Sequence, residues 1–514
     1  MLRRASLMIA LCIGSAVAAH GMSAGRPFSP AGRAVVPVLY LNTDFLAANA
    51  GKALLSTNIC WANPQNTPGT TPPERAAWRD ARRRTVEEWS RYARVNFYGW
   101  DGPDPVNHPT VCANGAPGVH IVICNMPQDE RCPALPNSQS APGGYAKANG
   151  VSNGVRLNPQ HDAGTLAHEV GHILGFYHEE ERADAPPIES GPCKKQSWPN
   201  SKPQRIGGYD KTGVMSYCMT ATAAPWLSPN DIASIELLYG RRKNHSLLTP
   251  RAKCAGAPDS AGSGVILSDC EEKAGQDWSA VATWSKGDAW HLRLSAPAKA
   301  EPKAEPKAEP KCLAAASATA SADVALASCV PGAEWRLQNV FIRGFGGLCL
   351  DLPGGQRAPG TPIQTWTCGA PGKVNQHWTR TRIGQIRYGT TAMCAAIAPA
   401  GELQLAPCSA DDDAQKFDFA DSAIRRISSG KCLQVNGPSN AEYASGSGLP
   451  AIASHIVEVA CNASLVQRFN FTGALRYDAA PNLCLTRGVD AKGATLSLAD
   501  CDNNPETQVW DYRF

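Results

Sequence analysis

The first half of the chain contains short apolar runs and segments in which apolar residues recur every three or four positions. In the segment from about residue 73 to 93 these positions hold Trp78, Ala81, Thr85, Trp89 and Tyr92. That spacing places them on one face of a helix, so we expect an amphipathic helix with this face in a core. Two runs rich in β-branched residues, 35–41 and 119–124, predict strands.

Two further helices are predicted, one from its apolar stripe and one from its ends. The stripe consists of Leu166, Val170, Ile173 and Leu174. The other helix begins where Ser228 can cap the first turn and Asp231 can complete a capping box, and it stops at Gly240. Because helices and strands are interleaved here, we expect an α+β domain over residues 20–243.

The second half of the chain consists of repeats. Twelve cysteines fall into six consecutive pairs: Cys254/Cys270, Cys312/Cys329, Cys349/Cys368, Cys394/Cys408, Cys432/Cys461 and Cys484/Cys501. An aromatic residue follows each pair, at Trp278, Trp335, Trp378, Phe417, Phe469 and Trp510, and all but the second stand in a Gln-x-aromatic motif. Repeats of about 40 residues cannot bury their own apolar faces, so three copies must close around a pseudo-threefold axis. Six repeats predict two all-β domains, 244–384 and 385–514.

The amino-terminal residues predict export. Residues 1–19 open with Arg3 and Arg4, continue through an apolar run and end in small residues, which is typical of a cleavable secretory signal peptide. Cys12 would leave with this segment, and the other 18 of the 19 cysteines form an even number suited to an oxidising compartment. No other stretch is long and apolar enough to span a membrane. We therefore expect a secreted, extracellular protein without a membrane span.

Charge gives little support to nucleic-acid binding. The formal net charge is only +4 over 514 residues. The basic cluster Arg82, Arg83 and Arg84 is most simply a solvated helix face. We therefore expect no nucleic-acid partner, and the chain is expected to be a monomer.

The candidate chemistry begins at His168-Glu169-Val170-Gly171-His172. Residues four apart on a helix point the same way, so His168 and His172 can share a tetrahedral metal ion. Gly175 can end the helix and let the chain turn, which would bring His178 to the same ion. Met215, in Gly-Val-Met-Ser-Tyr, lies at a distance suited to a tight methionine turn beneath the metal. We expect one catalytic Zn²⁺.

The run His-Glu-x-x-His-x-x-Gly-Phe-x-His-Glu-x-x-Arg, from His168 to Arg182, resembles the signature of astacin-like metzincin zinc endopeptidases. The resemblance covers about residues 34–243. It implies His168, His172, His178 and Tyr217 as zinc ligands. Glu169 would be the general base that activates a water molecule. Tyr217 would also stabilise the developing oxyanion, and Met215 would form a packing floor.

Glu179 has two interpretations at this stage. In the astacin family the matching glutamate pairs with the buried amino terminus of the mature enzyme. This chain leaves room for only a short segment between the predicted signal peptide and the first apolar run, so a large propeptide does not fit. The alternative is an ion pair with Arg182, three positions further on.

Residues 245–514 resemble ricin-B-type β-trefoil lectins. The third repeat carries the full set of matching binding residues, and the resemblance implies that Asp351 and Asn375 hold sugar hydroxyls while Trp366 stacks on the ring. Gln364 and Gln376 would support them. Gln434 and Thr486 stand where Asp351 stands, so the other repeats are expected to be structural.

Together these patterns predict a multidomain protein, with an α+β metzincin-type zinc peptidase domain followed by two all-β trefoils. The expected function is zinc-dependent hydrolysis of peptide bonds, targeted to glycoconjugates by the lectin domains. One alternative is a carbohydrate-binding lectin or toxin-like protein with a degenerate peptidase domain. Another is that the trefoils serve only as spacers. The intact motif and the complete third repeat argue against these alternatives.

Overall fold

A computed structural model of the chain describes most of residues 55–513. Its gaps of three or more residues are 101–110, 113–118, 125–143, 188–208, 219–226, 243–245, 259–263, 283–287, 295–310, 370–373 and 437–452. The predicted signal peptide, the predicted strand at 35–41 and Gly175 lie outside the described residues. None of the helices in the described part of the chain is long and apolar enough to cross a membrane.

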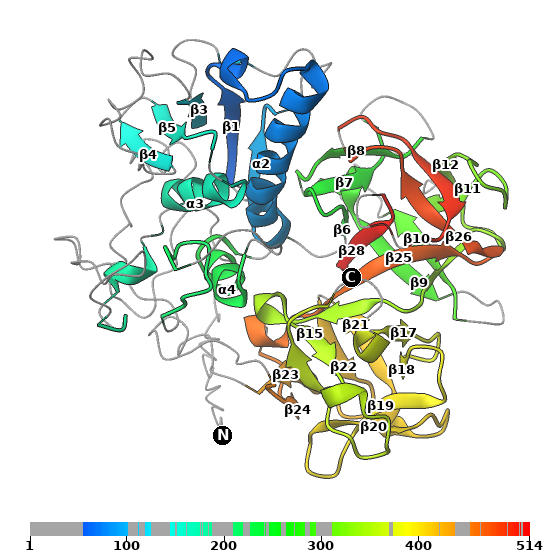
Figure 1. The fold of residues 1–514 in the computed structure, drawn as a ribbon. Helices are drawn as coiled ribbons and strands as arrows, with labels where there is room; N and C mark the ends of the chain where they lie inside the picture. Colours follow the sequence, from blue (N-terminus) through cyan, green and yellow to red (C-terminus); the bar gives the residue numbers. More distant parts are fainter. Residues whose placement is uncertain are drawn as a thin grey trace, which may run out of the picture.

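The described residues of the first half contain a five-stranded sheet and three α-helices (Figure 1). The strands are β1 (Leu55–Trp61), β2 (Val95–Tyr98), β3 (Val119–Ile123), β4 (Gly144–Asn149) and β5 (Ser152–Leu157), in the order β2-β1-β3-β5-β4. Only β4 runs antiparallel to its neighbour. The strand predicted at 119–124 is confirmed as β3. Its residues Val119, Ile121 and Ile123 are fully buried, because the sheet packs against helices.

The helices are α2 (Pro72–Tyr92), α3 (Gly164–Ile173) and α4 (Pro229–Tyr239). All three correspond to predicted helices. The predicted stripe of α3 is buried. On α4, Ser228 and Asp231 form the predicted capping box, and Gly240 ends the helix with φ 77°. On α2, Thr85, Trp89 and Tyr92 are buried, whereas Ala81 is exposed, so that part of the prediction was wrong.

The basic cluster on α2 is not the solvated face that the sequence suggested. Arg82 stacks on the Trp78 ring at 3.6 Å, and Arg83 pairs with Glu87 at 2.7 Å. Both arginines are buried, and only Arg84 is exposed. The prediction failed because tertiary packing covers this face from two sides. Arg82 lies near Asp162 of the first half, whereas Glu87, the partner of Arg83, lies near Lys253 and Arg251 of the second half.

The described residues of the second half form 23 short strands. The first two repeats contribute β6 (Ser246–Leu248), β7 (Lys253–Gly256), β8 (Ile266–Asp269), β9 (Trp278–Ala282), β10 (Trp290–Leu294), β11 (Lys311–Ala315), β12 (Val324–Ser328) and β13 (Glu334–Leu337). The next two contribute β14 (Phe341–Arg343), β15 (Cys349–Asp351), β16 (Gln364–Trp366), β17 (Trp378–Arg380), β18 (Ile386–Tyr388), β19 (Met393–Ile397), β20 (Leu403–Pro407) and β21 (Phe417–Ala420). The last two contribute β22 (Ala423–Arg426), β23 (Cys432–Val435), β24 (Ile456–Val459), β25 (Asn470–Tyr477), β26 (Ala480–Arg487), β27 (Leu496–Asp500) and β28 (Val509–Arg513).

The six repeats close into two β-trefoils, one of which is inserted into the other. Repeats 1, 2 and 6 meet through bridges such as Gly264 to Ala325 and Asp323 to Ser497. Repeats 3, 4 and 5 meet through bridges such as Pro362 to Gln404. We call repeats 1, 2 and 6 the first trefoil and repeats 3, 4 and 5 the second trefoil. In Figure 1 the first trefoil contains both green and red strands, whereas the second is mainly yellow.

The predicted division into domains 244–384 and 385–514 is therefore wrong for the described strands. A boundary at 385 would separate β17 from β18, which form an antiparallel hairpin. The long strand β25 instead joins the two trefoils. It pairs with β14 of the second trefoil and with β13 of the first. Counting repeats along the chain could not reveal this, because spatial closure does not have to follow sequence order.

The Gln-x-aromatic motifs hold each repeat together. In the third repeat Gln376 Nε2 donates to the Thr367 carbonyl (3.1 Å), and its Oε1 accepts from the Gly369 amide (2.8 Å). Trp378 Nε1 donates to the Leu350 carbonyl at 3.0 Å. Equivalent glutamine contacts form in the four other repeats that keep the motif. The aromatic residues of all six repeats are buried, three in each trefoil core.

Candidate functional site

Three histidine side chains converge in the first half of the molecule. His168 and His172 project from α3, and His178 follows the helix. The Nε2 atom of His178 lies 3.0 Å from that of His172 and 3.2 Å from that of His168. Ligand atoms about 2.0–2.1 Å from a tetrahedral zinc ion stand roughly 3.3 Å apart. The spacing of the three nitrogens therefore fits one metal ion.

The two histidines of α3 are held in the tautomer and the neutral protonation state that metal binding requires. His168 Nδ1 lies 2.7 Å from the Val214 carbonyl, and His172 Nδ1 lies 2.8 Å from the Phe176 carbonyl. Donation to these carbonyls leaves each Nε2 with a free lone pair. Burial, aided by the neighbouring His178, lowers the pKa of His168 to about 4, and burial also lowers the pKa of His172. Both rings are therefore neutral at physiological pH.

Met215 packs against α3, the helix that carries two of the histidines. It is buried, and its Sδ atom lies so close to Gly171 that a Cβ there would stand only 2.3 Å from the sulfur. A side chain at Gly171 would therefore displace either Met215 or α3. Glu169 lies next to His168 on α3 and is buried, with 5% of its surface exposed.

Tyr217 lies beside the histidines. Its ring centroid is 4.2 Å from that of His178 and 5.7 Å from that of His168. The side chain is 42% exposed, unlike Met215 two residues earlier. All six residues predicted for this centre thus lie on α3, on the segment that follows it and on the methionine turn, with Tyr217 on the open side.

Asp231 was predicted only as a helix cap, and the structure gives it a second contact. Its Oδ2 accepts from the Ser228 amide at 2.9 Å and from the Val214 amide at 2.7 Å. The carbonyl of Val214 in turn faces His168. Burial and the nearby Asp210 raise the pKa of Asp231 to about 7, against the effect of these amide donors. The capping box revealed the cap but not the contact with the methionine turn.

Glu179 forms the ion pair that was one of its two predicted roles. Its Oε2 lies 3.5 Å from Arg182 Nε and accepts from the Asp210 amide at 2.8 Å. Its amide also donates to the Met215 carbonyl at 3.1 Å. The chain terminus that would make the alternative pair lies outside the described residues. Glu179 thus ties the third histidine to the methionine turn.

A second polar cluster lies on the third repeat, in the second trefoil. Asp351 is buried and accepts from Gln364 Nε2 (2.9 Å), Asn375 Nδ2 (2.5 Å) and Gln376 Nε2 (3.1 Å). Asp351 pairs with Gln364 across β15 and β16, so Trp366 lies on the same face of β16 as Gln364. Trp366 is 44% exposed. The structure therefore gathers all five predicted sugar-binding residues around one carboxylate with an exposed aromatic ring at its edge.

The other repeats lack this carboxylate. Gly256, Ala314, Ala396, Gln434 and Thr486 stand two residues after the first cysteine, where Asp351 stands. Gln434 and Thr486 accept from the motif glutamines Gln467 and Gln508, each at 3.1 Å. In the fifth and sixth repeats, the side chain at the position of Asp351 is therefore engaged in a hydrogen bond within its own repeat.

Cysteine pairing follows the repeats. All six consecutive pairs of the second half form disulfides. In the first half Cys60 pairs with Cys112. These two sulfurs lie near His120, but because they are bonded to each other they cannot act as thiolate ligands. Many disulfides are typical of extracellular proteins.

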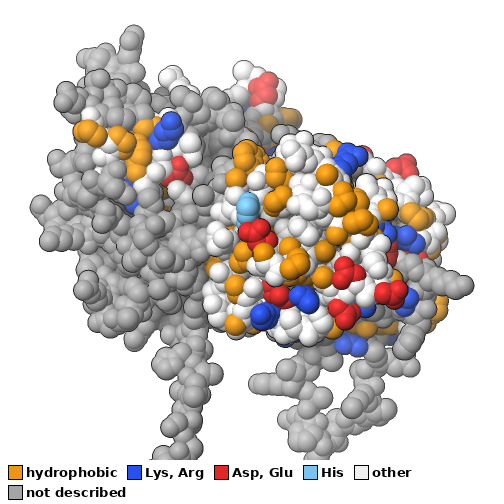
Figure 2. Space-filling view, turned by 90° about the horizontal axis from the view of Figure 1, so that it is seen from below, with side chains coloured by type: hydrophobic (Ala, Val, Ile, Leu, Met, Phe, Trp, Pro, Cys, Tyr) orange, Lys and Arg blue, Asp and Glu red, His pale blue; other side chains and the backbone are white. Residues whose placement is uncertain are grey.

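The second trefoil resembles a known lectin family in its sequence as well. The family model of the ricin-type beta-trefoil lectin domain matches residues 338–447. The match begins between β13 and β14, where the strand pairing places the start of the second trefoil. Face-on, the second trefoil carries interspersed charges of both signs among apolar side chains, without an extended basic surface (Figure 2).

Solved lectin structures resemble this half of the chain with TM-scores near 0.2. The R-type lectin C-half of an earthworm, in complex with GalNAc, is 20% identical, with a TM-score of 0.22, and the match covers 26% of this chain and 95% of that one. The agglutinin from Abrus precatorius is also 20% identical, with a TM-score of 0.22, covering 32% and 76%. The β-trefoil assignment depends on the family match and the strand pairing.

The amino-terminal region is homologous to a zinc metalloproteinase of the astacin family. The zinc metalloproteinase nas-3 of Caenorhabditis elegans is 33% identical over 125 residues. This match covers 22% of the present chain and 42% of the relative. The chain thus spans about two fifths of the length of the curated relative that it matches.

Proposed function

We propose that the protein is a secreted zinc endopeptidase that cleaves proteins on glycan-bearing surfaces. The convergence of three Nε2 atoms above Met215 carries the first part of this proposal. The homology to a zinc metalloproteinase supports it, and so does the neutral state of His168 and His172. The disulfides and the predicted signal peptide support secretion.

The chain's own residues would divide the work of hydrolysis. A zinc ion held by His168, His172 and His178 would polarise the scissile carbonyl and acidify the attacking water. Glu169 takes the proton from that water as its oxygen bonds to the carbonyl carbon, and returns it to the amine nitrogen as the C–N bond breaks. Tyr217, on the open side of the site, donates a hydrogen bond from its hydroxyl to the oxyanion.

The second trefoil would supply the glycan site. Asp351, held by three amide groups, and Asn375 would hold adjacent sugar hydroxyls through paired accepting and donating groups. Trp366 would offer its exposed ring to the apolar face of the sugar. Binding there raises the local concentration of a glycosylated substrate at the peptidase.

A lectin with a degenerate peptidase half is the competing function. It would retain the glycan site but would have no reason to keep Glu169, Met215 and the two Nδ1 contacts that fix the histidines. The intact centre favours the peptidase.

Hydrolysis of casein by the zinc-loaded protein tests the proposal. We expect cleavage that a chelator abolishes and that zinc restores. Glu169→Gln should remove cleavage without preventing zinc binding, while Glu271→Gln, an exposed carboxylate of the first trefoil, should cleave normally. A folded, zinc-loaded protein that cleaves no protein substrate would refute the peptidase.

A further inference from the structure

We propose that the peptidase and the glycan site form one rigid body, so that the enzyme selects substrates by the spacing between the glycan and the scissile bond. This inference rests on the proposed function and adds a substrate class to it. A lectin on a flexible tether would accept a glycan at many distances from the cleaved bond. A lectin fixed to the peptidase accepts only a glycan at the distance between the two sites.

The first trefoil is bound to α2 by buried charges. Arg91 of α2 pairs with Asp511 of β28 at 2.8 and 3.3 Å, and both side chains are buried. Arg251, before β7, makes two contacts with Asp80 of α2, at 2.7 and 3.1 Å. Of these two ion pairs only Arg91–Asp511 is buried, because Asp80 is partly exposed and also pairs with Arg84. A buried charge requires its partner, so separation of the two halves would break the buried Arg91–Asp511 pair. This buried pair resists opening in a way that an exposed ion pair does not.

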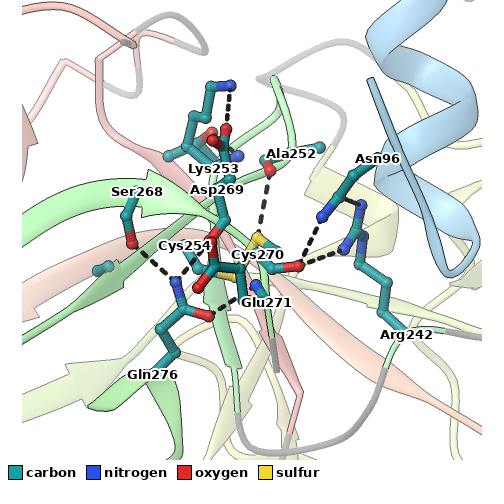
Figure 3. The surroundings of a disulfide bond; sticks show 12 residues. Asn96, Arg242, Ala252, Lys253, Cys254, Ser268, Asp269, Cys270, Glu271 and Gln276 are labelled. Carbon is teal, nitrogen blue, oxygen red and sulfur yellow. Dashed lines mark hydrogen bonds and ion pairs between the residues drawn. A yellow bond between two sulfur atoms is a disulfide. The ribbon is translucent and has the colours of Figure 1, made fainter. Parts of the chain in front are cut away.

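Arg242, between the two halves, is also buried. Arg242 follows α4, and its guanidinium donates to the carbonyls of Ser90 and Val95, to Asn96 Oδ1 and to the Cys270 carbonyl. Asn96 Nδ2 donates to the same Cys270 carbonyl at 2.7 Å. Figure 3 shows Arg242 and Asn96 meeting this carbonyl beside the Cys254–Cys270 disulfide. Arg242 thus links the peptidase to the first repeat.

The repeat that carries the glycan site packs directly on the peptidase. Its short helix η4 (Phe345–Gly347) precedes β15 and lies against α4. Gly347 has a φ of +70°, which favours glycine, and a Cβ there would stand 2.8 Å from Ile232 Cδ1, so the two segments approach closely. Arg343 also donates to the Tyr92 hydroxyl at 3.2 Å. Ile232 follows Asp231, which holds the methionine turn, so α4 contacts both that turn and the repeat that carries the glycan site.

The two trefoils are fixed to each other as well. Strand β25 runs through both without a linker. Arg380 of the second trefoil lies between the rings of Trp290 and Phe419, at 3.9 and 4.4 Å. Arg387 pairs with Asp288 of the first trefoil at 3.0 Å. The first trefoil, which lacks the sugar-binding carboxylate, therefore supports the second trefoil in addition to the direct contact between the second trefoil and the peptidase.

A distance measurement tests rigidity independently of activity. Ala81 of α2 and Ile427 of the second trefoil are exposed, so Ala81→Cys and Ile427→Cys can carry two spin labels on the full-length protein. Pulsed electron paramagnetic resonance should give one narrow distance distribution. Arg242→Ala should broaden it, whereas Arg425→Ala, in an exposed ion pair with Asp418, should not. A broad distribution in the parent protein would overturn the inference.

Glycopeptides test the consequence for specificity. One cleavable sequence would carry the same glycan at increasing distances from the scissile bond, and kcat/KM would be compared with that of the bare peptide. We expect at least a tenfold gain confined to a narrow range of spacings and absent in Trp366→Ala. A gain that declines only slowly with spacing, or no gain although glycan binding is intact, would overturn the inference while leaving the peptidase standing. Failure to cleave the bare peptide, or to bind any glycan, would instead overturn the proposed function and the inference together.

Discussion

Asp231 offers a sharp test of how the metal centre is positioned, because one carboxylate oxygen serves both α4 and the methionine turn. Asp231→Ala would leave the amides of Val214 and Ser228 without this acceptor. Each unsatisfied buried donor costs about 1–3 kcal/mol. Burial of the carboxyl, whose pKa is raised to about 7, itself opposes folding and offsets part of this loss. We expect the free energy of unfolding to fall by about 2–4 kcal/mol.

The effect on the metal site follows from Val214. Its carbonyl faces His168 Nδ1, so a displaced turn would misorient the first metal ligand. Loss of a contact that orients a metal ligand typically lowers metal affinity or activity by about 10–100-fold. Zinc affinity would be measured by competition with a chromophoric chelator, and hydrolysis with a peptide substrate.

Two matched variants separate positioning from helix capping. Ser228→Ala removes the other half of the capping box but leaves the contact between Asp231 and Val214, so it should lower stability by about 1 kcal/mol with zinc affinity unchanged. Asp231→Asn keeps an acceptor oxygen and should retain zinc affinity. If Asp231→Ala bound zinc and cleaved peptide like the parent protein, Asp231 would be a helix cap only.

Three other variants or treatments have defined outcomes. Tyr217→Phe should lower kcat about 10–1,000-fold with little change in KM, and an equal rise in KM instead would assign Tyr217 to substrate binding. Trp366→Ala should abolish retention on a glycan column while casein cleavage persists, with the exposed Ile427→Ala as control. In metal-free protein the raised pKa of Asp231 makes the folded state bind its proton more tightly, so its contribution to stability falls as pH rises from about 4 to about 7. Asp231→Asn should reduce the slope measured by denaturant unfolding across this range, while Glu179, whose pKa burial raises to about 8, still contributes to it. An unchanged slope would assign it to other groups.

Local pattern was sufficient for the elements and for much of both sites. The helical stripe of α3 and the capping box of α4 depend on residues a few positions apart, and both are present as predicted. The spacing of His168, His172 and His178 was also local enough to place them together. In the same way, the regular cysteine pairs and Gln-x-aromatic motifs predicted six stacked repeats.

Contacts between distant segments could not be predicted in this way. The sequence suggested a solvated basic face on α2 because nothing local indicates that Asp511 and Arg251 would cover that helix. It suggested two consecutive trefoils because the repeats look alike, and similarity among repeats does not say which three close around one axis. The contact of Asp231 with Val214 is of the same kind, since an aspartate that caps a helix has the same local sequence whether or not a second donor reaches it.

The sequence by itself determined the secondary structure, the candidate chemistry and the number of repeats, because these depend on periodicity and on the donor atoms that each side chain carries. The tertiary structure alone decided the nesting of one trefoil in the other and the burial of α2 charges such as Arg91. It also decided that the repeat carrying Asp351 packs against α4 through η4. The physical reason is that these features depend on packing between surfaces far apart in the chain, where complementary shape and charge decide the partner.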